Sequence, residues 1–148
     1  MAYIPSDTEW YIAEIVLEIQ VEGDPRNVVH RNLTLIRAHT PEQALEKASD
    51  VGKQSETGYR NRSGQSVTIR FRGLSSLNVI HEKLEHGAEL RYIESVSIQE
   101  KEIAELVKPK LELEVFRDLT PCEGPDYGSE EITRQALELM ARDRENRS

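Results

Sequence analysis

The clearest pattern in the chain is an alternation of apolar and polar positions over Glu9–Glu22. A period of two predicts a β-strand that buries one face. The other face is apolar at its start and polar at its end, which favours a central strand or a strand covered on both faces. The predicted core positions are Tyr11, Ala13, Ile15, Leu17, Ile19 and Val21, and the second face carries Trp10, Ile12, Glu14, Val16, Glu18 and Gln20.

A second apolar run, Val28–Ala38, follows the turn residues Gly23–Asn27, so the two runs predict a β-hairpin. The next segment resembles a helix start: Thr40 suits the cap, Pro41 the first helical position, and Gln43 can close a capping box. Apolar residues then repeat at helical spacing up to a glycine that suits the left-handed end of a helix. These positions are Ala44, Leu45, Ala48, Val51 and Gly52.

Two further strands are predicted, over Ser66–Arg72 and Leu90–Ile98. Between them, Leu74–Glu85 fits either a short helix or an irregular turn. The expected fold is therefore α+β: an antiparallel sheet of about four strands in the order β-β-α-β-β with one packed helix, plus a C-terminal amphipathic helix.

The chain changes character after residue 98. Glu100–Val107 predicts a weak helix, and Leu111–Phe116 alternates like a short strand. A proline- and glycine-rich linker then leads to an amphipathic helix that must dock on its own body or on a partner. The expected divisions are an α+β body at 1–98 and an acidic extension at 99–148, with the linker at 118–128 and the terminal helix at 129–144.

Charge is divided unevenly along the 148 residues, whose net charge is −8. Residues 1–93 hold 13 acidic and 11 basic side chains, whereas residues 94–148 hold 14 and 8, so the extension carries most of the excess. A net negative chain is a poor candidate for coating DNA, which needs a dominant cationic surface.

The single cysteine cannot form an internal disulfide, which favours a reducing compartment. No apolar run approaches the roughly 18 residues of a membrane span, and the start Met1–Asp7 lacks the features of a signal peptide. We therefore expect a cytoplasmic protein with no membrane partner.

The segment Thr57–His81 has no acidic residue and carries four arginines. Guanidinium groups match the geometry of phosphates and carboxylates, and a nearby tyrosine could stack on a base. The alternative, which we favour, is a solvated strand face whose arginines pair with glutamates. The candidate binding residues are Tyr59, Arg60, Arg62, Arg70 and Arg72.

An apolar patch is predicted on the second face of the first strand, at Trp10, Ile12 and Val16. We favour its burial inside the protein or in a homodimer, and the alternative is contact with another protein. The residues predicted to cover it internally lie on the terminal helix, at Ile132, Leu139 and Met140, beside Ala136.

No set of residues predicts catalysis. His81 and His86 miss the spacing of a zinc-protease helix by one position. Cys122 has no basic neighbour that could lower the pKa of its thiol. Glu14 and Glu18 are better explained as solvated charges on a strand than as a catalytic pair. We expect no catalytic residue, no cofactor and no metal site.

The order of features resembles a family of short bacterial domains of unknown function. The resemblance rests on Trp10-Tyr11 before a strand, an alanine- and glutamate-rich helix ending at Gly52, the turn Tyr59-x-Asn61-x-x-Gly64, and Phe71-x-Gly73 followed by Gly87-Ala88-Glu89. It covers about Glu9 to Ile93, and Ile69 stands where an aromatic residue is expected. The resemblance implies the fold and a bacterial origin, and no activity.

The leading hypothesis is a non-enzymatic bacterial protein-binding module of the immunity, adaptor or inhibitor type, whose partner is another protein or a second copy in a homodimer. The first alternative is a nucleic-acid- or phosphate-binding accessory protein that uses the arginines. The second is a structural subunit of a phage or secretion system.

Overall fold

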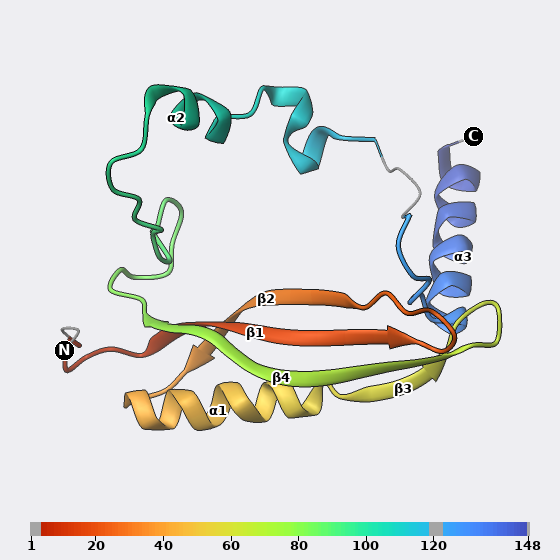
Figure 1. The fold of residues 1–148 in the computed structure, drawn as a ribbon, viewed down its shortest axis with the longest axis horizontal. Coiled ribbons are helices and arrows are strands. Elements are labelled where there is room, and N and C mark those ends of the chain that lie inside the picture. Colours follow the sequence, from red (N-terminus) through yellow and green to blue (C-terminus); the bar gives the residue numbers. More distant parts are fainter. Residues whose placement is uncertain (1–3, 119–122, 148) are drawn as a thin grey trace.

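The computed structural model describes residues 4–118 and 123–147 (Figure 1). Over these ranges it finds no helix that is both long enough and apolar enough to cross a membrane. The elements are β1 (Trp10–Val21), β2 (Val28–Arg37), α1 (Pro41–Gln54), β3 (Thr57–Arg60), β4 (Ser66–Val79), α2 (Glu100–Leu106), the 3₁₀ turns η1 (Lys110–Glu112) and η2 (Glu114–Phe116), and α3 (Glu130–Arg147).

The strands form one antiparallel sheet in the order β2-β1-β4-β3, which confirms the predicted α+β class. β1 is central: Tyr11 lies opposite Ile36 of β2 and Val79 of β4. Both edges of β1 are paired and α1 covers the face with Tyr11, Ala13, Ile15 and Leu17 (Figure 1), and Ile12 is buried on the other face as well.

Helix α1 begins as the sequence predicts. The hydroxyl oxygen of Thr40 accepts the backbone N–H of Gln43 at 3.1 Å, and the side-chain oxygen of Gln43 accepts the N–H of His39 at 2.7 Å. The first bond satisfies a donor that a helix N-terminus leaves free. In the second, Gln43 reaches the residue before the cap and not Thr40 itself, so the predicted capping box is not formed in its usual pattern. The helix buries its small residues against the sheet, at Ala44, Ala48 and Gly52.

Gly52 does not end the helix, so that prediction is wrong. The helix continues to Gln54 and is capped by Ser55 in a right-handed conformation. Gly52 is needed for close approach instead: a Cβ atom there would lie 2.4 Å from the ring of Phe71 on β4. The glycine lets the last turns of the helix rest on an aromatic side chain of the sheet.

The fourth strand lies elsewhere than predicted. Leu90–Ile98 forms no strand, and the polar segment before β4 supplies the four-residue β3. β4 extends beyond Arg72 as far as Val79, into the segment that sequence left as helix or turn. Two register shifts in the β1–β4 pairing leave Arg72 and Ser75 outside the regular pairs, which breaks the alternation that would have revealed the long strand.

The segment from residue 93 to residue 118, which we call the arm, arches away from the sheet on the side opposite α1 (Figure 1). The predicted weak helix is present as α2, but the strand predicted over Leu111–Phe116 is wrong, because the segment forms the turns η1 and η2 and pairs with no strand. None of the residues in α2, η1 or η2 is buried.

After the arm, the described chain returns to the other end of the sheet. Tyr127 packs beside a small core of Ile19, Val21 and Val67, and its backbone carbonyl accepts the hydroxyl of Tyr59. The terminal helix α3 follows and confirms the predicted helix, with Leu137, Leu139 and Met140 exposed.

Candidate functional site

We call the sheet face opposite α1 the open face. Along the β2 edge, this face carries a strip of three apolar side chains that remain about half exposed: Val29 at 51%, Leu33 at 56% and Leu35 at 46%. Charged residues of all three long strands share the open face with the strip. Beyond the strip, the open face comprises Trp10, Ile12, Glu14, Val16 and Glu18 of β1, Arg31 and Arg37 of β2, and Arg70 and Arg72 of β4.

Glu14 is the buried anchor of the open face, with only 6% of its surface exposed. Its carboxylate accepts a hydrogen bond from the hydroxyl of Ser75 and another from Arg31 at 2.9 Å, and Arg91 lies 3.9 Å away. The Ser75 hydrogen bond, followed by that of Arg31, lowers the pKa of Glu14 against the opposing effect of burial. The carboxylate therefore stays ionised at neutral pH and ties β2, β4 and the segment after β4 to β1.

Glu18 has its own partners, so the two carboxylates do not act as a pair. Asn27 donates to Glu18 at 2.7 Å, and the guanidinium of Arg72 lies 3.5 Å from it. Arg70 lies opposite Glu18 in the strand register. The arrangement is a charged border in which the cations outnumber the anions.

The predicted arginine group is divided between two places. Arg60, Arg70 and Arg72 lie on the open-face side of β3 and β4, whereas Arg62 lies in the turn between these strands. Arg60 also donates to the backbone carbonyl of Gly64 at 2.7 Å. Tyr59 points to the α1 side, so the structure does not bring it together with Arg70 and Arg72.

Tyr59 and Asn61 hold the returning chain. Burial, followed by the neighbouring Tyr127 and Asp126, raises the pKa of the Tyr59 hydroxyl. Asn61 is fully buried, and its amide group donates to the carbonyl of Asp126 at 3.0 Å. Its side-chain oxygen accepts two backbone N–H groups of its own turn, from Ser63 and Gln65. The Tyr-x-Asn turn is therefore a docking point for residues 126–127, a role that the sequence did not reveal.

The predicted apolar interface is only partly assembled. Trp10, Ile12 and Val16 lie along β1 on the open face, where Ile12 is buried and the guanidinium of Arg37 lies 5.5 Å from the Trp10 ring. Helix α3 stands near the opposite end of the sheet (Figure 1), with Leu139 at 63% and Met140 at 55% exposure. The side chain of Ile132 lies outside the described residues, as does Cys122.

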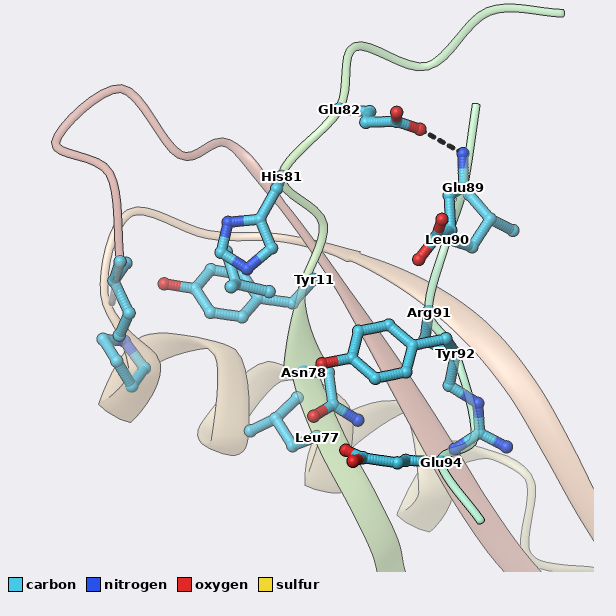
Figure 2. Close-up of a pocket in the computed structure, with 13 residues that line it drawn as sticks. Tyr11, Leu77, Asn78, His81, Glu82, Glu89, Leu90, Arg91, Tyr92 and Glu94 are labelled. Atoms are coloured by element: carbon cyan, nitrogen blue, oxygen red, sulfur yellow. Dashed lines mark hydrogen bonds between the residues drawn. The ribbon is translucent and has the colours of Figure 1, made fainter. Parts of the chain in front are cut away.

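A pocket of about 780 Å³ lies between the end of β4, the start of α1 and residues 89–94. Figure 2 shows Tyr92 and Glu94 across from Leu77 and Asn78. The carboxylates of Glu82, Glu89 and Glu94 outnumber the single guanidinium of Arg91, so the pocket is a poor receptor for a phosphate.

Tyr11 and His81 place a phenol hydroxyl group and an imidazole ring at this pocket. The buried hydroxyl of Tyr11 has no hydrogen-bond partner in the described chain. His81 lines the pocket and His86 does not. Within residues 4–118 and 123–147, no three His, Cys, Asp or Glu side chains form a group that could hold a metal ion. Sequence reasoning missed this pocket because it depends on a long-range approach of residues 89–94 to β4.

Comparison with known families places the fold in context. Residues 10–92 match the model of a domain of unknown function, DUF4288, and the chain belongs to this family. Comparisons with the curated proteins and with the solved structures each gave no match. The matched range contains the whole sheet, α1 and most of the residues that line the pocket, and it ends where the arm begins.

Proposed function

We propose that this chain is a non-enzymatic bacterial protein-binding module of the immunity, adaptor or inhibitor type, which works in the cytoplasm and binds its partner on the open face. The observation that carries the proposal is the exposed strip of Val29, Leu33 and Leu35 on an otherwise well-packed sheet. Apolar side chains that gather on one face and have a polar border are typical of protein interfaces.

The border defines the chemistry of the partner. Arg31 lies within the strip on β2, Arg70 and Arg72 lie on β4, and Glu14 and Glu18 lie between them on β1. A matching surface would carry apolar side chains at its centre and acidic side chains at its rim. Covering these three half-exposed side chains would contribute about 3 kcal/mol, at roughly 2 kcal/mol for the full burial of one Val or Leu side chain.

A nucleic-acid- or phosphate-binding role has less support. The stacking residue that it requires, Tyr59, faces the other side of the sheet and donates its hydroxyl to Tyr127. Glu18 lies beside Arg72 and opposes a phosphate there. A structural subunit of a phage or secretion system would instead form open-ended assemblies, which light scattering detects.

Affinity purification with a matched pair of variants tests the proposal. The face variant is Leu33→Lys with Leu35→Lys, and the control is Leu45→Lys, because Leu45 is also about half exposed but lies on α1. Partners identified by mass spectrometry are purified and their dissociation constants measured. We expect the face variant to bind at least about tenfold more weakly, since 1.4 kcal/mol corresponds to tenfold, and the control to bind as the unchanged chain does.

Equal binding by the face variant would overturn the proposal. Binding that is lost in Arg70→Glu with Arg72→Glu, and that is competed away by RNA or DNA at moderate salt, would favour the nucleic-acid role instead. Binding of a protein that survives in nuclease-treated extracts supports the protein-binding role.

A further inference from the structure

The two outer edges of the sheet differ in how well they are protected against pairing with another strand. β2 forms one edge over ten residues, and it pairs with β1 without a register shift. It contains no proline. Its two arginines do not place free charges at the edge, because Arg31 forms an ion pair with Glu14 and Arg37 forms one with Glu9, both on the neighbouring segment. A long regular edge strand presents a row of free backbone groups that can pair with another strand.

The opposite edge is protected. β3 is only four residues long and covers the first part of β4. Beyond it, the side chain of Glu56 accepts the backbone N–H of Phe71 at 3.2 Å, and Arg91 reaches Ser76 at 3.1 Å. The two bulges in β4 further disturb the regular ladder. Such features prevent strand addition, and within the described sheet they are all at one edge.

The arm contains a segment that fits the unprotected edge. In Leu111–Phe116, leucine and valine alternate with glutamate, which is the pattern of a strand with one apolar face. In the single chain this segment has no strand partner and forms η1 and η2. Leu111 is 74% exposed and Val115 is 83% exposed, so the apolar face of the segment is uncovered.

The apolar and charged groups of the two segments are complementary. The strand β2 places Val29, Leu33 and Leu35 on the open face and the polar Asn32 and Thr34 on the other. An added strand that sets its leucines beside this strip sets its glutamates beside the polar residues. Residues 25–41 contain three arginines and no acidic residue, whereas the arm contains seven acidic and four basic residues. The pairing therefore satisfies hydrophobic complementarity, and the opposite net charges of the two segments favour their approach.

We infer that two copies of this chain form a dimer in which residues 111–116 of each copy add to β2 of the other as a fifth strand. The inference rests on the proposed function, since it names a second copy as the partner and places that copy's arm beside the open-face strip. A reciprocal exchange has twofold symmetry and closes, so it gives a dimer and no fibre. The free backbone groups of β2 are then paired, and the apolar side chains of the arm lie beside Val29, Leu33 and Leu35 on the open face.

The mass of the full chain in solution, measured by size exclusion with light scattering between about 1 and 100 µM, tests the dimer. The arm variant is Leu111→Ser with Val115→Ser, and its control is Leu106→Ser, another exposed leucine of the arm. We expect a dimer for the unchanged chain and the control. We expect monomers for the arm variant and for Leu33→Lys with Leu35→Lys. All substituted side chains are exposed, so circular dichroism should show an unchanged fold.

Mixing the arm variant with the face variant tests the contact itself. The face variant retains an intact arm and the arm variant an intact β2, so the mixture should regain one of the two exchanged strands and form a heterodimer. A dimer that persists in the arm variant would overturn the inference, because it indicates direct pairing of two β2 edges. A monomeric unchanged chain at 100 µM would also overturn it.

The failures of the two proposals are distinguishable. If the chain is monomeric but the face variant loses a purified foreign partner, the dimer fails and the protein-binding function stands. If the dimer behaves as expected but a foreign partner binds the face variant as tightly as before, the open face is a self-association surface and the proposed function fails.

Discussion

The two faces of the sheet carry different kinds of side chains. The face under α1 is packed with small and apolar residues, such as Ala44 and Ala48, that let the helix lie close. The open face combines a buried carboxylate, a charged border and an apolar strip that nothing in the described chain covers. The first face holds most of the buried apolar core, whereas the second leaves apolar and charged side chains exposed.

The largest expected effect is a difference in the free energy of unfolding between substitutions at two neighbouring residues of β2. Ile36 is 3% exposed beneath α1, whereas Leu35 is 46% exposed on the open face. We expect Ile36→Ala to lower the free energy of unfolding by about 3 kcal/mol because it leaves a cavity. Leu35→Ala should lower it by less than about 1 kcal/mol. Urea unfolding of dilute protein measures both, and equal losses would remove the distinction between the faces.

The next effect tests how closely α1 lies on the sheet. A side chain at Gly52 must displace the ring of Phe71, which is 2.4 Å from the position of the new Cβ. We expect Gly52→Val to destabilise the fold by about 2 kcal/mol through overpacking. Adding Phe71→Ala should relieve the clash. The expectation fails if Gly52→Val unfolds at the same urea concentration as the unchanged chain.

A smaller effect concerns the far end of the covered face, where residues 126–127 dock. Tyr59→Phe removes the hydrogen bond to the carbonyl of Tyr127, and we expect a loss of about 1 kcal/mol. Limited proteolysis should then cleave the chain faster between α3 and the body. Tyr92→Phe is the control, because that exposed tyrosine lies outside the docking point. Equal cleavage of all three proteins would contradict the docking.

The smallest effect is a pH dependence on the open face. The pKa of Glu14 is lowered from its ordinary value of 4.5 by Ser75 and Arg31. Its contribution to stability is therefore fully present above pH 4.5 and is lost as the pH falls through the lowered pKa. Glu14→Gln should melt below the unchanged chain at pH 7, and the difference should shrink as the pH falls. A constant difference would mean that the carboxylate charge does not matter.

Sequence periodicity predicted the parts of the fold that depend on local pattern. β1, β2 and the start of α1 follow from alternation, turn residues and the cap at Thr40. β4 was too short in the prediction because bulges at Arg72 and Ser75 shift its alternation. Gly52 was misjudged because its role depends on Phe71, a contact between residues far apart in the chain.

The candidate site was harder to predict than the fold. The spacing of Arg70 and Arg72 did indicate a shared strand face, but the side to which Tyr59 points depends on the pairing of β3 with β4. The exposed strip on β2 was missed because Leu33 and Leu35 look like core residues in sequence. Only the structure shows that α1 covers the opposite face.

Amide hydrogen exchange in β2 tests most directly whether the open face and its edge take a protein partner. The full chain is compared at about 1 µM and about 100 µM, with the arm variant as the reference. We predict that amides of Val28–Arg37 exchange at least about tenfold more slowly in the concentrated unchanged chain, whereas those of the arm variant do not change. Exchange rates in β2 that are independent of concentration and identical in both proteins would contradict this.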